Sequence, residues 1–249
     1  MPERNKHGLG RYIPSDVRRI VRQRCGFGCV ICGLSLYDYE HFDPDFKDAK
    51  CHDPDGITLL CMQCNQKRNR KVLSVETVQR ANARPKCLEQ GFANEAFDFG
   101  TDPIEVIFAG VSFCNCQTII EVDGISILEI KPPSQNGEPF LLSGRFCDDT
   151  GQATLKIEDN IWSVGDDCWD VECEGATITI RKDHGEIALV ISSEPPHRLK
   201  VERLDMEFEG VFFRGNANLL EVSFDNKNCS SWQGGSMTNC RVGMSFNTA

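Results

Sequence analysis

Cys29-Val30-Ile31-Cys32 and Cys61-Met62-Gln63-Cys64 are the two stretches that decide how the first third of this chain folds. Each CxxC pair lets two sulfur atoms approach one ion from a tight turn, and two such pairs complete a tetrahedral zinc site. The alternative, that these are ordinary core cysteines, is less consistent with two correctly formed pairs. The 28 residues between the pairs exceed the roughly 15–20 of a plain zinc ribbon. The spacing therefore predicts a structural zinc site with an insertion between its two halves.

The insertion carries Tyr39-Glu40-His41-Phe42-Asp43-Pro44, and Asn65 directly follows the last cysteine. Hydrolysis of a phosphodiester needs a nucleophilic water, a base that deprotonates it, and positive charge at the leaving oxygen. A histidine, whose ordinary pKa is about 6.5, suits the base at neutral pH. Carboxylate and amide oxygens suit a hard divalent ion that keeps positions open for phosphate and water. Glu40, His41 and Asn65 are therefore candidate catalytic residues.

Three helices are expected around these motifs, and the first two are basic. Ser15 is a plausible N-cap for a helix over residues 16–24, a second helix should begin near Cys61 or Gln63, and Ser74 should start a third that runs to about Ala83. The basic side chains are either an ordinary solvated surface or contacts to DNA phosphates, and both interpretations stay open. The residues concerned are Arg18, Arg19, Arg22, Lys67, Arg68, Arg70 and Lys71.

Charge divides the chain into two parts. Residues 1–85 hold 15 lysines and arginines against 10 acidic residues, a net of +5, whereas residues 86–249 hold 12 against 27, a net of −15. A basic first part is compatible with a phosphate backbone as partner, although +5 alone is modest support. The amino-terminal residues show no apolar signal segment, and no stretch approaches the ~18 apolar residues of a membrane span. The 14 cysteines then suggest metal ligands and buried thiols in a reducing cytoplasm.

Beyond about residue 110 the sequence becomes β-rich. Short runs alternate apolar with polar residues or are rich in β-branched side chains, and Gly, Asp, Asn and Pro punctuate them. The sequence thus predicts an α+β chain: a small zinc-bound domain over 1–85, a junction over 86–110, and an all-β, largely antiparallel sandwich or barrel over 111–249. Residues 226–249 are expected to be irregular. The expected strands are 118–122, 125–130, 153–158, 176–181, 186–191, 199–203 and 219–224.

Residues from about 11 to 71 resemble the HNH (ββα-metal) endonucleases in their zinc-stapled form, through the segments 22–33, 40–44 and 58–67. The resemblance implies a metal-dependent nuclease acting on DNA, in which His41 is the general base and Glu40 and Asn65 hold a catalytic Mg²⁺ or Mn²⁺. Asn69, one helical turn after Asn65, is an additional or alternative ligand. The resemblance also implies that the four cysteines hold a structural Zn²⁺. Restriction or defence against phage is the biological role expected from the context in which members of this family usually occur.

The chain departs from the family pattern at three places. Glu40 stands where many members have Asp, Asn65 where many have His, and Asp55-Gly56 where an Asn usually braces the hairpin. The missing Asn favours the alternative function, a non-catalytic zinc module that binds nucleic acid or protein. His52, beside Cys51, is expected to be a surface histidine. The acidic β-rich part carries no recognised catalytic motif, and we expect it to contact a protein partner or a second copy of the chain.

Overall fold

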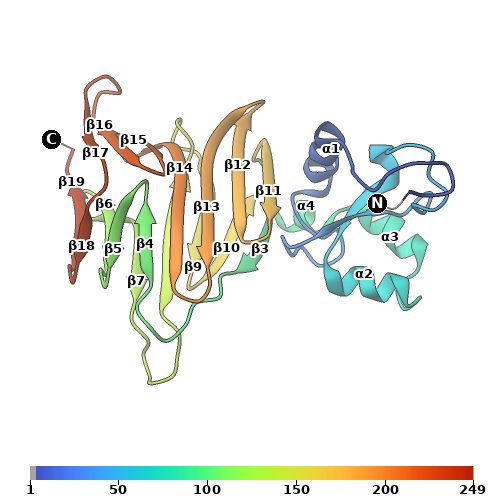
Figure 1. The fold of residues 1–249 in the computed structure, drawn as a ribbon, viewed down its shortest axis with the longest axis horizontal. Helices are drawn as coiled ribbons and strands as arrows, with labels where there is room; N and C mark the ends of the chain where they lie inside the picture. The colour runs from blue at the N-terminus through green and yellow to red at the C-terminus, as the bar shows by residue number, and fades with distance from the viewer. Residues whose placement is uncertain (1–3, 249) are drawn as a thin grey trace. The chain divides into compact units, whose positions relative to one another are not determined.

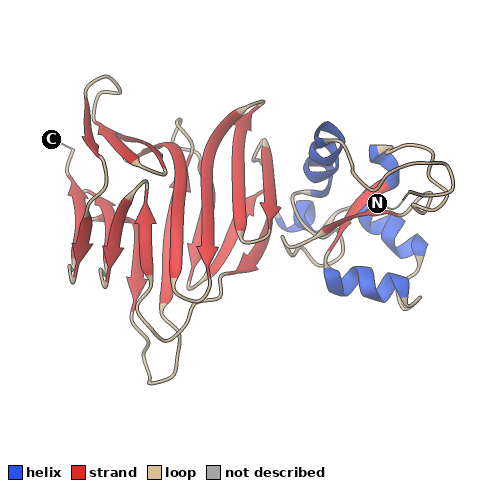
Figure 2. Cartoon of the chain, viewed as in Figure 1, coloured by secondary structure: helices blue, strands red, loops and turns tan. Residues whose placement is uncertain are grey.

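The computed structural model describes residues 4–248, which form two compact units (Figure 1). The first unit comprises the chain up to Glu95 together with Val164–Val171, and the second comprises Ala96–Ser163 and Glu172 onward. The boundary between the two units, at Glu95–Ala96, falls inside the expected junction over 86–110, and this segment also contains two strands and a helix. Helices occur in the first unit, and strands make up most of the second (Figure 2).

The first unit begins with a helix and then forms a hairpin followed by a second helix. β1 pairs with β2 in antiparallel register, from Asp38 opposite Leu60 to His41 opposite Ile57. Every side chain of β2 is buried, and α2 starts directly after Cys61. The elements are α1 (Ser15–Cys25), β1 (Asp38–His41), the 3₁₀ turn η1 (Pro54–Gly56), β2 (Ile57–Leu60), α2 (Met62–Asn69), α3 (Val75–Ala83), α4 (Lys86–Gln90) and β3 (Phe92–Ala96).

The ends of the helices follow local chemistry. α3 begins as expected, because the Ser74 side chain accepts a hydrogen bond from the Thr77 amide at 3.2 Å and so satisfies one exposed helical N–H group. The expected Ser15 cap of α1 is wrong: Ser15 is already helical, and Pro14 occupies the cap position without a side-chain hydrogen bond. α1 ends at Gly26, whose φ of 68° lies in the left-handed region that glycine adopts without a steric penalty.

The second unit is built from two sheets, although the residues Val164–Gly165 and Asp170–Val171 of two of their strands belong to the first unit. Six strands of one sheet lie in the order β19-β6-β7-β8-β9-β10, and the other contains the run β11-β12-β13-β14-β15-β16-β17, with β4, β5 and β18 joined to it beside β14. The strands are β4 (Glu105–Phe108), β5 (Val111–Cys114), β6 (Thr118–Val122), β7 (Ile125–Lys131), β8 (Leu141–Cys147), β9 (Ala153–Glu158), β10 (Ile161–Gly165), β11 (Asp170–Glu174), β12 (Thr177–Asp183), β13 (Glu186–Glu194), β14 (Arg198–Phe208), β15 (Val211–Asn216), β16 (Leu219–Ser223), β17 (Cys229–Trp232), β18 (Ser236–Thr238) and β19 (Val242–Phe246).

Aromatic side chains from the two sheets pack against each other inside this unit. Phe108 of β4 stacks on Phe146 of β8 with ring centroids 6.3 Å apart, and Phe213 of β15 meets Phe246 of β19 at 5.6 Å. Alternation explains the arrangement: in β4, Val106 and Phe108 are buried while their neighbours are half-exposed. The second unit is therefore a two-layer β structure with its core between the sheets.

The expected strands of this unit all occur, with ends shifted by a few residues at most except for β14, which continues to Phe208. The expectation of an irregular carboxyl-terminal segment is wrong. β18 and β19 pair in parallel with β5 and β6, so their partners lie more than a hundred residues away. Within residues 4–248, no helix combines the length and apolar character that crossing a membrane requires.

Candidate functional site

The four cysteines of the two CxxC pairs come together in the first unit. Their sulfur atoms all lie within 4.8 Å of one another. Cys32 Sγ lies 3.6 Å from Cys61 Sγ and 3.9 Å from Cys64 Sγ. Tetrahedral zinc bonded to sulfur at about 2.3 Å places its ligands about 3.8 Å apart. Spacing and thiol chemistry therefore fit a structural zinc ion.

Backbone hydrogen bonds hold the two pairs in register. The Cys29 amide donates to the Leu34 carbonyl at 2.8 Å, and the Gly33 amide donates to the Cys29 carbonyl at 2.8 Å, which closes the first pair into a tight turn. The Val30 amide donates to the Leu59 carbonyl at 3.0 Å and so ties this turn to β2, directly before Cys61. In the second pair, Cys61 Sγ accepts from the Cys64 amide at 3.4 Å at the start of α2.

The thiols of the cluster influence one another strongly. A hydrogen bond from the Cys32 side chain lowers the pKa of Cys29 to about 5, while burial and the neighbouring sulfurs raise the pKa of Cys64 to about 12. The pKa of Cys32 is raised above its ordinary value mainly by the same hydrogen bond with Cys29. Four thiolates this close repel one another, and a divalent cation would supply the positive charge that lets all of them ionise.

His41 lies at the end of β1 and is 7 % exposed. Its Nε2 atom lies 3.1 Å from Nδ1 of His52, and its ring meets the Phe46 ring in an edge-on contact with centroids 5.3 Å apart. Burial, with smaller contributions from the charges of His52 and Arg11, lowers the pKa of His41 from 6.5 to about 4. The imidazole is therefore neutral at neutral pH, which is the state in which it can accept a proton.

His52, expected at the surface, is half-exposed and contacts His41. The loop between β1 and β2 carries His52 back against His41, although the two are eleven positions apart. Sequence reasoning missed this pair because the loop has no periodic pattern from which its path could be predicted. The one available signal was the presence of two histidines within the same insertion.

Glu40, Asn65 and Arg68 form a polar group beside His41. Arg68 Nη1 contacts Glu40 Oε1, and Arg68 Nη2 contacts Asp45 Oδ1. Asn65 is within hydrogen-bonding reach of the Glu40 carboxylate. Burial raises the pKa of Glu40, while the Arg68 charge opposes that rise. Carboxylate and amide oxygens at this place are the donors that Mg²⁺ or Mn²⁺ prefers.

Asn69 lies one turn further along α2 and is exposed. Its Nδ2 atom donates to Asn65 Oδ1 at 3.4 Å. The two side chains therefore share one face of the helix, as their spacing predicts. Apart from the four cysteines, the part of the chain that the structure describes contains no further close group of three histidine, cysteine or acidic ligands.

Two of the arginines proposed to contact phosphate bind carboxylates of this chain instead. Arg22 is buried, and its guanidinium binds Asp170 through two hydrogen bonds of 2.8 and 2.6 Å. Arg68 has a side chain only 10 % exposed and binds Glu40 and Asp45. The expectation is therefore wrong for Arg22, and Arg68 acts within the site instead, because both cations already have carboxylate partners.

The other basic residues keep positions at the surface. Lys67, Arg70 and Lys71 are exposed in and after α2. On α1, the Arg19 guanidinium lies over the Trp169 ring at 5.3 Å and that of Arg18 lies 6.0 Å from the Tyr12 ring. The exposed cations near α2 are thus the ones best placed for an external phosphate backbone.

Asp55-Gly56, where the resemblance predicts a bracing Asn, has a packing role. The Gly56 carbonyl accepts from the Phe42 amide at 3.0 Å, directly after His41. A Cβ atom at position 56 would lie 2.3 Å from the Asp43 carbonyl oxygen, closer than two such atoms can approach. The end of the hairpin is therefore held through backbone contacts that only glycine allows.

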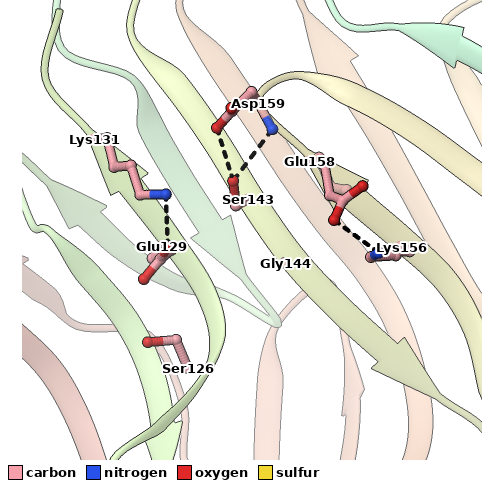
Figure 3. A pocket seen from close by; sticks show the side chains of 9 residues that line it. Ser126, Glu129, Lys131, Ser143, Gly144, Lys156, Glu158 and Asp159 are labelled. Carbon is pink, nitrogen blue, oxygen red and sulfur yellow. Dashed lines mark hydrogen bonds and ion pairs between the residues drawn. The ribbon is translucent and has the colours of Figure 1, made fainter. Parts of the chain in front are cut away.

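The second unit has an open hollow of about 600 Å³ on one sheet, lined by residues that include Ser126, Glu129 and Lys156 (Figure 3). Its charges pair locally: Lys131 with Glu129 at 3.4 Å, and Lys156 with Glu158 at 2.7 Å.

Comparison of the whole chain with protein-family models, with curated proteins and with solved structures finds no match. The geometry of the first unit is therefore the basis for assigning a function.

Proposed function

We propose that this protein is a metal-dependent endonuclease that hydrolyses DNA phosphodiester bonds, as its resemblance to the HNH endonucleases implies. The observation that carries the proposal is the hairpin-and-helix arrangement around the cysteine cluster. It places Glu40 and His41 at the end of β1, next to Asn65 in the first turns of α2. A binding module that used zinc only for stability would not need a buried neutral histidine beside a carboxylate and an amide.

His41 is the general base in this proposal. Its burial keeps the ring neutral at neutral pH, so the imidazole can take a proton from the attacking water. The contacts with Phe46 and His52 restrict the ring to one orientation. Restricting the base in this way removes part of the entropy cost of reaching the reactive geometry.

Glu40 and Asn65 would hold a Mg²⁺ or Mn²⁺ ion, which when bound supplies positive charge for the phosphate and the leaving oxygen. Arg68 binds Glu40 on one side and Asp45 on the other, so it balances carboxylate charge and orients Glu40. A Zn²⁺ ion at the four cysteines would have a structural role, joining the turn before β1 to the start of α2.

Cleavage of supercoiled plasmid tests the proposal. Purified protein is incubated with Mg²⁺ or Mn²⁺. A brief EDTA treatment is the control that removes this ion, and the zinc that the protein retains after the treatment is measured separately. His41→Ala should abolish nicking and linearisation but keep its zinc and its DNA binding. His184→Ala changes an exposed histidine of the second unit and should cleave like the wild type.

Equal cleavage by His41→Ala and the wild type would overturn the assignment of the base. Zinc-loaded wild-type protein that binds DNA without cutting it under any of these conditions would favour the alternative, a non-catalytic zinc module.

A further inference from the structure

The hydrogen bond between His41 and His52 has two arrangements with opposite consequences. A neutral imidazole carries one N–H group and one acceptor nitrogen. If His41 Nε2 donates to His52 Nδ1, then the other nitrogen of His41, Nδ1, keeps its lone pair. If His52 Nδ1 donates instead, His41 carries its proton on Nδ1 and neither of its nitrogens can take a proton from water.

We propose that His52 is a positioning residue for catalysis: its Nδ1 atom accepts the proton of His41 Nε2 and so keeps His41 in the tautomer whose Nδ1 atom is the base. The inference rests on the proposed nuclease function. In the step it supports, water transfers one proton to His41 Nδ1 and its oxygen bonds to phosphorus. The bond to the leaving oxygen then breaks, and that oxygen keeps the electron pair and is protonated from solvent.

Hydrogen bonds fix the loop that carries His52, so its side chain can hold the His41 ring in place. Asp53, the next residue, accepts from the Asp55 amide at 3.1 Å through its side chain and from the Gly56 amide at 3.1 Å through its carbonyl. Gly56 in turn accepts from Phe42, the residue after His41. The two histidines are thus attached to the same end of the hairpin by a short chain of hydrogen bonds.

The other side of the loop is also held. Asn5 Nδ2 donates to the Phe46 carbonyl at 2.6 Å and to the Ala49 carbonyl at 2.7 Å. Phe46 itself packs against the His41 ring. His41 is therefore confined between an aromatic contact and a hydrogen-bonding partner, and both come from one anchored segment.

Three variants of His52 test the presence and the position of its hydrogen-bond acceptor. Asn carries its Oδ1 atom on Cγ, as His carries Nδ1, so His52→Asn retains an acceptor at nearly the same place. His52→Gln moves the acceptor one bond further away, and His52→Leu removes it. His184→Asn, at an exposed turn of the second unit, is the matched control.

The primary measurement is NMR of protein labelled with ¹⁵N in its histidine rings, with the His41 signals assigned from their loss in His41→Ala. We expect His41 to be protonated at Nε2 alone in the wild type and in His52→Asn, and to populate both tautomers in His52→Leu, where no partner selects one of them. An unchanged tautomer in His52→Leu, or a wild-type His41 protonated at Nδ1, would overturn the proposal. This readout does not depend on DNA cleavage.

Kinetics supply the second test. We expect His52→Leu and His52→Gln to lower kcat for plasmid nicking by about 10- to 100-fold, with an unchanged KM for DNA, and His52→Asn to remain close to the wild type. Equal kcat values for Asn, Gln and Leu at this position would contradict the proposal. If the wild type itself fails to cleave, the nuclease function is wrong, while the NMR result still decides whether His52 positions His41.

Discussion

Arg22 and Asp170 form a buried ion pair across 148 positions of the sequence, with Arg22 Nε donating to Oδ1 at 2.8 Å and Nη2 donating to Oδ2 at 2.6 Å. Their side chains are 4 % and 1 % exposed. Arg22 Nη1 also donates to the Tyr39 hydroxyl at 2.8 Å. The pair therefore links α1 and β1 to the segment Val164–Val171, which belongs to the same unit.

Asp170→Asn should destabilise the first unit by about 3 kcal/mol or more, because it leaves a buried guanidinium without its counter-charge. Hydrogen exchange of the α1 amides measures this change without interference from the second unit. Asp102→Asn, at an exposed position, should change little. Equal protection of α1 in the two variants would show that the pair does not stabilise this unit.

Metal analysis should find one zinc ion per chain, bound by the four cysteines. Cys61→Ser should lose the ion and unfold the first unit, because a structural zinc site contributes directly to folding. Cys51→Ser is the control, since Cys51 is exposed and outside the cluster. Zinc retained in Cys61→Ser, or lost in Cys51→Ser, would contradict this ligand set.

The stability of the first unit should fall between pH 6.5 and 4 partly because of His41. The unfolded chain protonates this ring near pH 6.5, whereas burial holds the folded pKa at about 4. The contribution is thus complete above pH 6.5 and is lost as the pH falls to 4, by about 1–3 kcal/mol. Urea unfolding of the wild type and of His41→Asn across this range measures it.

The control for that experiment is His184→Asn, whose pH dependence should match the wild type because the change is at an exposed residue of the other unit. A wild-type His41 that titrates near pH 6.5 by NMR would refute the prediction.

Gly56→Ala should disrupt the end of the hairpin. The new methyl group would lie 2.3 Å from the Asp43 carbonyl oxygen, so the backbone after His41 must move, at a cost of about 1–3 kcal/mol. Gly10→Ala is the matched control, because nothing lies within 4 Å of a Cβ at that position. We expect Gly56→Ala also to weaken the His41–His52 hydrogen bond. Indistinguishable unfolding midpoints for the two variants would contradict the packing argument.

DNA binding should depend on the exposed cations of α2 and the turn after it. Replacing Lys67, Arg70 and Lys71 together by Gln should lower the slope of log affinity against log salt by about 2–3, since each phosphate contact contributes about 0.9. The control replaces Lys131, Lys156 and Lys227, exposed residues of the second unit, by Gln. An equal loss in both variants would show that only net charge matters.

Several local features could be predicted from short stretches of sequence. The Ser74 cap lies three residues before the amide it satisfies, and the strand pattern of Thr118–Val122 is contained within five residues. The hairpin of β1 and β2 followed by α2 has the order that the cysteine spacing and the resemblance predict. In each case the interacting groups are close in the sequence, so the pattern itself contains the interaction.

The failures have a different cause. Ser236–Phe246 looks irregular by composition, yet it adds β18 and β19 to strands that lie more than a hundred residues away. Residues 86–110 contain the boundary between the units, as expected, but their composition does not indicate that Glu105–Phe108 pairs with β14 and β5. Whether such a segment forms a strand depends on an unpaired sheet edge that it can join, and a local sequence pattern does not show that edge.

The sequence by itself determined the chemistry of the candidate site: four thiols with zinc spacing, a carboxylate and a histidine before one turn, and an amide at the start of the next helix. Only the tertiary structure decided which partners these groups have. In the folded chain His52 lies within hydrogen-bonding distance of His41, Arg68 forms an ion pair with Glu40, and Arg22 forms a buried ion pair with Asp170. The physical reason is that residue type and spacing set what a side chain can do. Its pKa, orientation and availability depend on burial and on neighbours that the chain supplies only once it has folded.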